Sequence, residues 1–312
     1  MEQKMEYIYA VYQEGSISRA AQKLFISQPA LSLAIQRVEK SLGRTIFDRS
    51  HSPLRLTRVG ELYIQKYHEI KRLEREFENQ VNDLYDLKKG TLIMGGTQFI
   101  LSYIFAPVLT KFSRQYPQIT IQLLECRSDT AQSLLLEGSI DTYLRASPCA
   151  SSLRPIGKAF VDHLLIAVPK HYQQEHDLPP ERLTMDMVVR DEHLHAPHAD
   201  FLRLSKLPFL QLSPGNNLHN RIIELFREHG AVPEIKMQVE QFATSCFLAD
   251  SGMGATLVSA MMIKQGFGHN LFFYKVNSPL LVREFYFVGR QKGYISSSTK
   301  SFMQMLHGWY SY

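Results

Sequence analysis

The sequence has few of the features that mark membrane, secreted or disulfide-bonded proteins. No window contains the ~18 to 20 uninterrupted apolar residues that a bilayer-spanning helix requires. The first thirty residues lack a basic start, an apolar core and a small-residue cleavage site. The 312 residues include three cysteines, Cys126, Cys149 and Cys246, which form no CxxC pair. This set fits reduced thiols better than a disulfide framework or a zinc site, so we expect a soluble, cytoplasmic protein.

Signatures of catalysis are also missing. The chain contains no G-x-S-x-G, no phosphate-loop signature and no HExxH. The nearest dyad is Asp162-His163, but adjacent residues of a strand point to opposite faces and do not easily act together. We therefore expect no catalytic residues, no metal and no cofactor, and we keep a small-molecule enzyme as the remote alternative.

The composition is that of an ordinary globular protein, but its charge is unevenly distributed. Hydrophobic residues make up 45% of the chain, charged residues 21%, and the net charge is +5. The length predicts two or three domains at about 100 to 200 residues each. Residues 1–58 contain nine Lys/Arg and five Asp/Glu, whereas residues 90–312 contain twenty and eighteen. A basic module before a near-neutral body indicates a nucleic-acid-binding domain attached to another kind of domain.

Apolar spacing in residues 1–58 predicts three short helices and a hairpin. Gly15 ends the first helix, Ser27 caps the third, and Pro29 suits its first turn. Two short strands around a polar tip at 49–53 predict a wing. Three helices with a tight joint between the second and third form a helix-turn-helix, whose last helix enters the major groove by its N-terminal end.

Several polar residues of this module are candidate DNA contacts. Gln28 and Ser32 can hydrogen-bond to base edges, and Arg37 can reach phosphate. Arg49, His51 and Arg55 lie in the predicted wing, where they suit minor-groove or backbone contact. The alternative is a packing unit with solvated basic residues, and charge alone does not decide between the two.

A long stretch of this module resembles a known family. The segment AAQKLFISQPALSLAIQRVEKSLGRTIFDRS, followed by LRLTRVGE, is similar to the winged helix-turn-helix of the LysR-type transcriptional regulators. The resemblance implies a recognition helix that begins with Ser27, Gln28, Pro29 and Ser32. It also implies DNA contact by Arg49 and Arg55. Many members of the family have a basic residue directly after the serine that matches Ser32, where this chain has Leu33. Leu33 either touches a thymine methyl group or packs, so the operator sequence stays open.

Residues 59–89 are predicted to form one long linker helix, capped by Thr57. At ~1.5 Å per residue it would be roughly 45 Å long. Its apolar residues advance mostly in steps of three and four, which gives a narrow seam that favours a partner helix. In the resembling family this segment pairs with a second subunit. We therefore expect dimerisation through Tyr63, Tyr67, Ile70, Phe77, Val81 and Leu84. The alternative is a helix that packs on its own domain.

From Thr91 onward, strands alternate with helices, which predicts an α/β domain with a parallel sheet and ligands at its carboxyl edge. The segments GTLIMGG-T, FAPVLTKFSRQYP, LLLEGSID, PFLQLSPGNN and LADSGMGA resemble landmarks of the LysR-type effector domain. That domain has two Rossmann-like lobes, as in periplasmic solute-binding proteins. The resemblance implies an effector domain at 90–312, with one lobe at about 90–162 and 268–312 and the other at about 163–267. It places the strand at 272–276 on the first lobe.

The predicted cleft between the lobes collects polar residues at strand ends. The candidate effector contacts are Thr97, Gln98, Phe99, Ser128 and Arg145 from the first lobe, and Ser213 and Thr244 from the second. Hydroxyls, amides and a helix N-terminus suit an anionic group, and Arg145 can bind a carboxylate with two hydrogen bonds. The family's effector contacts match Thr97, Gln98 and Ser128. Alternatively, Arg145 pairs with Asp141 or Glu125, and the hydroxyls simply cap helices.

These observations predict a LysR-type regulator that binds a two-fold DNA operator as a homodimer or homotetramer, with RNA polymerase as a further partner. A small anionic metabolite would close the lobes and change transcription. Three alternatives stay open: a redox sensor using Cys126 with a pKa lowered by Arg127, a metal site at His193, His195 and His198, and an architectural DNA binder. The effector, the operator and the direction of regulation are not determined by the sequence.

Overall fold

The computed structural model describes residues 2–85, 89–146 and 151–310. The chain divides into two compact units, the first made mainly of residues before position 88 and the second mainly of those after it. Cys149 and the end of the predicted linker at 86–88 lie outside the described residues. Within the described ranges, no helix combines the length and the apolar character needed to cross a bilayer.

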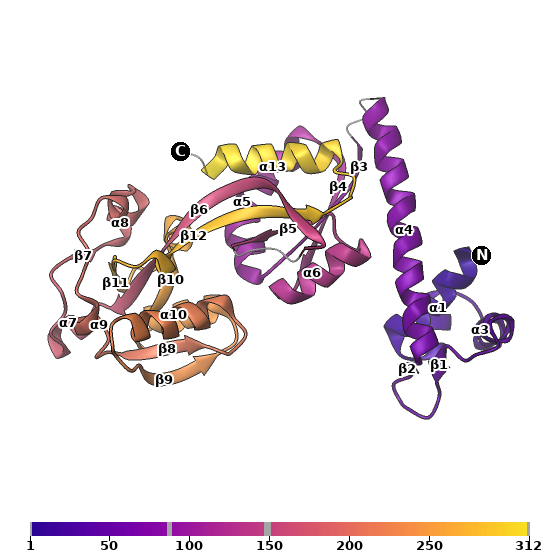
Figure 1. The fold of residues 1–312 in the computed structure, drawn as a ribbon, viewed down its shortest axis with the longest axis horizontal. Coiled ribbons are helices and arrows are strands. Elements are labelled where there is room, and N and C mark those ends of the chain that lie inside the picture. The colour runs from indigo at the N-terminus through magenta and orange to yellow at the C-terminus, as the bar shows by residue number, and fades with distance from the viewer. Residues whose placement is uncertain (1, 86–88, 147–150, 311–312) are drawn as a thin grey trace. The chain divides into compact units, whose positions relative to one another are not determined.

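The first unit is a winged helix-turn-helix (Figure 1). It consists of α1 (Glu2–Glu14), α2 (Ile17–Lys23), α3 (Gln28–Leu42), the strands β1 (Phe47–Asp48) and β2 (Arg55–Leu56), and the long helix α4 (Arg58–Leu84). Ser16, Ser27 and Thr57 cap the helices that follow them, because each side chain accepts a hydrogen bond from a backbone N–H in the first turn. The core is formed by Ile8, Val11, Ala20, Ala21, Leu31, Ile35, Val38, Ile46, Phe47 and Ile64. The predicted fold of this module is confirmed.

Two tyrosines of α4 contact residues of their own unit. Tyr63 packs against the helical core, and the ring of Tyr67 stacks on that of Tyr9 with 4.5 Å between centroids. Both side chains are half-buried, so part of each contacts its own unit, and their role in dimerisation stays a prediction. The exposed apolar residues of this helix are Leu62, Leu73, Phe77, Val81 and Leu84.

The start of α4 is held closely against the wing. A Cβ on Gly60 would lie 2.2 Å from the carbonyl oxygen of Ile46, so only glycine fits at this position. The Thr57 hydroxyl donates to the carbonyl oxygen of Thr45 at 2.7 Å while its oxygen accepts from the Gly60 N–H at 3.1 Å. The wing and the long helix therefore form one rigid corner.

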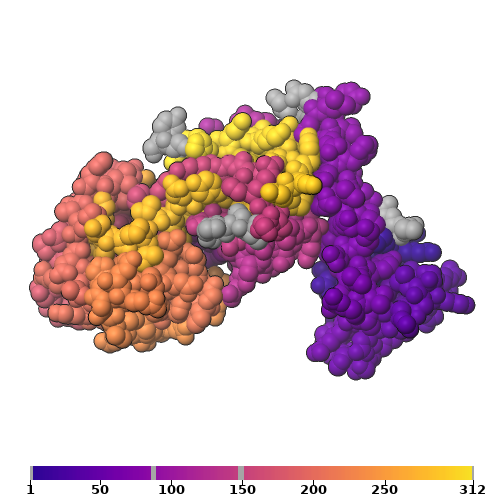
Figure 2. Space-filling view, viewed as in Figure 1, coloured from indigo at the N-terminus to yellow at the C-terminus, as the bar shows by residue number. Residues whose placement is uncertain are grey.

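The first lobe of the second unit is built on parallel strands. The strands β3 (Lys89–Gly96), β4 (Gln118–Glu125) and β5 (Thr142–Arg145) lie in the order β4-β3-β5. The connections contain η1 (Ile100–Phe105), α5 (Ala106–Gln115) and α6 (Ser128–Glu137). The C-terminal helix α13 (Ser297–Tyr310) packs on this lobe, where Phe302 makes edge-to-face contacts with Phe105 and Phe112. Figure 2 shows α13 and neighbouring C-terminal residues in yellow on its surface.

The second lobe contains the strands β7 (Arg182–Leu183), β8 (Pro208–Leu212), β9 (Glu234–Val239), β10 (Thr256–Ser259) and β11 (Leu271–Tyr274). Its helices are α7 (Tyr172–Glu175), α8 (Met185–Val189), η2 (Glu192–Leu194), α9 (Phe201–Leu204), α10 (Asn217–Glu228), α11 (Phe242–Asp250) and α12 (Ala260–Lys264). β8 and β9 are parallel, and Phe209 bridges to Ala255 before β10. The helices α10 and α11 each follow one of the two parallel strands.

Two strands connect the lobes (Figure 1). β6 (Leu153–Pro169) pairs with β12 (Val282–Arg290) over its first part and with β10 and β11 over its last part. β12 follows η3 (Pro279–Leu281) and also pairs with β5. The sequence predicts only the end of β6, from Leu164, and so misses the part that crosses between the lobes.

The position of β11 differs from the prediction. This strand was expected on the first lobe, yet it pairs with Ile166–Pro169 of β6 and with β7 in the second lobe. A strand of seventeen residues such as β6 spans about 55 Å at ~3.3 Å per residue. β6 therefore offers edges for strand pairing in both lobes. The short apolar run that forms β11 does not indicate which of these edges it pairs with.

A buried ion pair lies where the crossing strands meet. Asp162 of β6 is 0% exposed and Arg283 of β12 is 6% exposed. Arg283 Nε donates to Asp162 Oδ2 at 3.0 Å, and Ser259 Oγ donates to Asp162 Oδ1 at 2.7 Å. The guanidinium also lies over the rings of Phe285 and Phe99, at 5.0 and 5.5 Å from their centroids. This network joins residues of both lobes through the two crossing strands.

Replacing Arg283 by Met should destabilise the second unit by about 3–5 kcal/mol, because the Asp162 carboxylate would stay buried without its partner. Urea unfolding followed by the fluorescence of Trp309, the single tryptophan, measures this unit. The matched control is Lys158→Met, which removes an exposed ion pair to Glu284 on the same two strands and should leave the stability nearly unchanged, because solvent screens such a pair. Equal effects of the two substitutions would contradict the conclusion that the buried pair of Asp162 and Arg283 stabilises the second unit.

Candidate functional site

The exposed end of α3 is the first candidate site. Gln28 and Pro29 are exposed, Ser32 is half-buried, and Arg37 is exposed one turn further along. Ser27 has a structural role as well, since its hydroxyl accepts a hydrogen bond from the Ala30 N–H at 3.3 Å. The predicted base-reading residues therefore lie together on one accessible end of the helix.

The wing, which follows α3 in the chain, carries the other predicted basic DNA contacts. Glu39 of α3 accepts a hydrogen bond from the Ile46 N–H at 2.8 Å and pairs with Arg49 at 3.4 Å, which ties the wing to α3. His51 lies 3.6 Å from Asp48. Hydrogen bonds from Ser50 hold the pKa of Asp48 below its ordinary value, so this carboxyl stays charged. Arg55 is exposed on β2.

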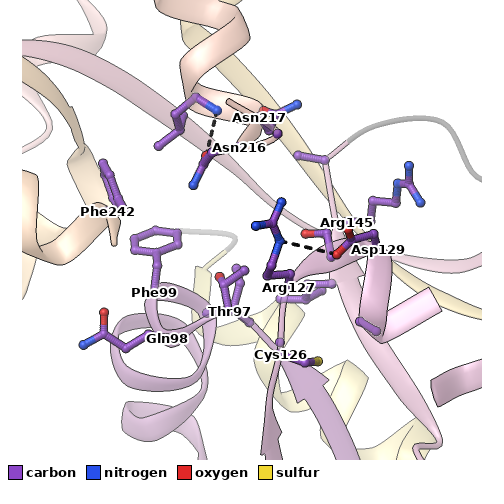
Figure 3. A pocket seen from close by; sticks show the side chains of 18 of the residues that line it. Thr97, Gln98, Phe99, Cys126, Arg127, Asp129, Arg145, Asn216, Asn217 and Phe242 are labelled. Carbon is purple, nitrogen blue, oxygen red and sulfur yellow. Dashed lines mark hydrogen bonds and ion pairs between the residues drawn. The ribbon is translucent and has the colours of Figure 1, made fainter. Parts of the chain in front are cut away.

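The second candidate site is a cleft of about 570 Å³ between the two lobes of the second unit. Its walls are the segments that follow the parallel strands: residues 96–100 after β3, 125–132 after β4, 213–220 after β8 and 240–242 after β9. Each of these segments leads into a helix, so η1, α6, α10 and α11 all begin at the cleft, and the first turn of a helix favours negative charge. Figure 3 shows the labelled side chains from both lobes around this space.

Six of the seven predicted effector residues line the cleft. They are Thr97, Gln98, Phe99, Ser128, Arg145 and Ser213. Thr244 is exposed on α11 and is not part of the lining. Because α11 begins at Phe242, its first residue and the preceding Gln241 line the cleft instead.

The cations of the cleft differ in their surroundings. Arg145 Nη1 donates to the side chain of Gln132 at 3.0 Å. Arg127, which the sequence does not single out for the cleft, pairs with Asp129 at 3.7 Å and points into the pocket in Figure 3. A Cβ on Gly215 of the second lobe would lie 2.8 Å from Arg127 Nη2, and Gly215 has φ +89°. The positive φ favours glycine at this position, and the guanidinium of one lobe lies close to the backbone of the other.

One end of the cleft is aromatic. The rings of Phe99 and Phe242, labelled in Figure 3, pack edge to face with 5.2 Å between centroids. The two rings come from opposite lobes. The guanidinium of Arg283 lies against the ring of Phe99. Asn216 caps α10 by accepting from the Leu218 N–H at 3.0 Å. Phe242, Asn216 and Asn217 were not predicted as cleft residues, although each follows soon after the end of a strand, which was a usable signal.

The chemistry around Cys126 does not favour a reactive thiolate. Burial raises the pKa of its thiol, and the nearby Asp129 and Glu125 raise it further. A redox role would require Arg127 to lower this pKa, and the net shift is upward. Cys246 is fully buried, and burial raises its pKa strongly.

The histidines of the second lobe do not gather into a metal site. His193 is 2% exposed and packs against His163 with 5.7 Å between ring centroids, whereas His195 and His198 are exposed. Across the described ranges, no group of three His, Cys, Asp or Glu side chains is placed to hold a metal ion. Asp162 binds Ser259 and Arg283 while His163 faces His193, so the adjacent pair does not form a dyad.

Acidification should destabilise the second unit through His193. Burial lowers the pKa of His193 from 6.5 to about 4, so the unfolded chain binds more protons between these pH values. The contribution of neutral His193 to the free energy of unfolding is therefore complete above pH 6.5 and is lost as the pH falls toward 4. At pH 5 the loss should be about 2 kcal/mol. Urea unfolding of wild type and His193→Phe at pH 7.5 and 5 measures the difference, with His195→Phe as the exposed control. An unchanged pH dependence in His193→Phe would contradict this account.

Comparison with known proteins identifies both units. Residues 3–61 match the family model "Bacterial regulatory helix-turn-helix protein, lysR family", and residues 86–184 and 182–311 match the "LysR substrate binding domain". The chain is 25% identical over 302 residues to the uncharacterized HTH-type transcriptional regulator YcgK of Bacillus subtilis, covering 96% of this chain and 92% of that one. It is 27% identical over 310 residues to a probable RuBisCO transcriptional regulator of Cyanidioschyzon merolae, covering 97% and 96%.

Solved structures share the whole fold. Full-length CbnR in complex with its target DNA matches with a TM-score of 0.68 at 18% identity, over 99% of each chain. This likeness confirms the predicted order of a helix-turn-helix domain and a two-lobed α/β domain. Since the two family models together span most of the sequence, the chain belongs to the lysR family and is a DNA-binding transcriptional regulator.

Proposed function

We propose that a small anionic effector, bound between the two lobes, controls how this regulator acts on DNA. The observation that carries the proposal is the cleft in which helix N-termini from both lobes converge. Backbone N–H groups and helix dipoles favour negative charge at such positions. Arg127 and Arg145 add two guanidinium groups, which suit carboxylate or phosphate oxygens.

The proposed contacts divide between the lobes. Thr97, Gln98, Ser128 and Arg145 would hold the effector on the first lobe, and Ser213 on the second. Phe99 and Phe242 would cover its apolar part. Because β6 and β12 are the strands that cross between the lobes, an effector that contacts both sides would rotate one lobe against the other about these strands. This is a population shift, and it requires higher affinity for the closed state.

On the DNA side, we propose that the N-terminal end of α3 enters the major groove. Gln28 and Ser32 would read base edges, while Arg37, Arg49, His51 and Arg55 would contact the backbone. The proposed division is a DNA-binding domain at 1–58, a linker helix at 59–89 and an effector domain at 90–312. A homodimer or homotetramer would read a two-fold operator.

The exposed apolar stripe of α4 would hold two subunits together. Leu73, Phe77, Val81 and Leu84 follow one another in steps of three and four, and Phe77 is 67% exposed. Such a stripe on a helix of 27 residues is typical of pairing with a second helix. Leu62 continues the stripe, and Ile70 lies half-buried at its edge.

The effector site can be tested with the full-length protein. A panel of small carboxylates, phosphorylated metabolites and neutral sugars is screened by thermal unfolding monitored through Trp309. An anionic compound at 100 times its Kd should raise Tm by on the order of 5 °C. Thr97→Val should abolish the shift, and Thr244→Val, outside the cleft, should leave it unchanged. Stabilisation by neutral sugars alone, or an intact shift in Thr97→Val, would argue against the proposed site.

The dimer interface is tested by combining Leu73→Asp with Phe77→Asp. Two charges in the stripe should prevent helix pairing because each would be buried without a partner. Light scattering should then report the mass of one chain, 35.9 kDa. Val232→Asp, a substitution of an exposed apolar residue in the second unit, serves as the control and should keep the wild-type mass. A double variant with the wild-type mass would remove α4 as the interface.

A further inference from the structure

The corner between α2 and α3 carries an aromatic residue in an unfavourable position. Phe25 has φ +56°, its N–H donates to the Gln22 carbonyl at 3.1 Å, and the Ile26 N–H donates to the Ala21 carbonyl at 3.0 Å. These bonds close the end of α2 in the pattern whose left-handed residue is usually Gly and sometimes Asn. A bulky side chain is strained in this conformation, so local structure does not explain a phenylalanine here.

Packing does not explain it either. Phe25 is 95% exposed, more than any other large hydrophobic residue of the described chain. The ring therefore gains nothing from the core of its own unit, whereas transfer out of water onto an apolar surface would stabilise it. A strained and fully exposed aromatic side chain points to a binding partner.

Leu33 is a second exposed apolar residue of the same module. It lies between the buried Leu31 and Ile35, and on an α-helix each of those positions is about 200° away around the axis. Leu33 therefore points away from the core, and it is 48% exposed. Gln28 and Ser32, the proposed base-reading residues, precede it on the exposed part of α3.

We propose that Phe25 and Leu33 bind the C5-methyl groups of thymines in the operator. The proposal rests on the entry of α3 into the major groove, where thymine presents the apolar group of the base edges. The chemistry of Gln28 agrees with it, because a glutamine amide pairs best with adenine, whose partner in the base pair is thymine. The DNA-binding domain would thus read A·T pairs through the amide of Gln28 and the apolar side chains of Phe25 and Leu33.

Uracil substitution tests this contact directly, since deoxyuridine lacks the methyl group and keeps the hydrogen-bonding edge of thymine. A duplex enriched from a random pool by the full-length protein is made once with thymine and once with deoxyuridine, and binding is measured by fluorescence anisotropy. The wild type should lose about fourfold in affinity for each methyl group that it buries.

Variants separate the protein contact from effects of uracil on DNA shape. Phe25→Asn, which suits the left-handed conformation, and Leu33→Ala should each reduce the thymine preference, and the double variant should bind both duplexes equally. Leu42→Ala, an exposed leucine at the far end of α3, should keep the wild-type preference. Circular dichroism should show an unfolding temperature of Phe25→Asn no lower than that of wild type.

The outcomes separate the two proposals. Equal binding of both duplexes by the wild type, or an unchanged preference in the double variant, would overturn the methyl contact alone. A wild-type protein that enriches no sequence from the pool would overturn sequence reading by α3, and the methyl contact with it.

Discussion

The two-lobed unit depends on the buried pair of Asp162 and Arg283. Both lie on the strands that cross between the lobes, and both are nearly inaccessible to water. Burying two charges is expensive unless their remaining hydrogen-bonding groups are satisfied. Here Ser259 donates a hydrogen bond to the other oxygen of the Asp162 carboxylate, and the rings of Phe99 and Phe285 cover the guanidinium of Arg283. A rotation of the lobes that broke these contacts would leave a charge buried without its partners, which disfavours such motions.

The same pair connects the crossing strands to the proposed effector cleft. Phe99, which Arg283 contacts, forms the aromatic end of the cleft with Phe242 of the other lobe. An effector that displaced Phe242 from Phe99 would change the covering of the buried charge. Filling of the cleft would therefore be linked, through Phe99, to the buried charges on the crossing strands.

Local chemistry explains why much of this molecule follows from the sequence. Ser27, Pro29 and Gly43 set the limits of α3 by capping and backbone geometry, and the lining at Thr97 and Ser128 follows from strand ends. The features that the sequence did not predict depend on contacts between residues far apart in the chain. The partner of β11 depends on how far β6 extends, and the stacking of Tyr67 depends on Tyr9 of another helix. Gly215 gives no sign in the sequence that it faces Arg127.

The distribution of cleft residues between the lobes determines how strongly an effector would favour the closed arrangement of the lobes. An effector held by the first lobe alone would bind open and closed forms equally and shift nothing. Ser213, Asn216 and Asn217 lie on the second lobe, so closure would add contacts that the open form lacks. One or two added hydrogen bonds are worth about 1–3 kcal/mol, which matches the coupling energies usual for allosteric proteins. The polar residues of the second lobe, rather than the stronger cations of the first, would therefore determine how far binding moves the lobes.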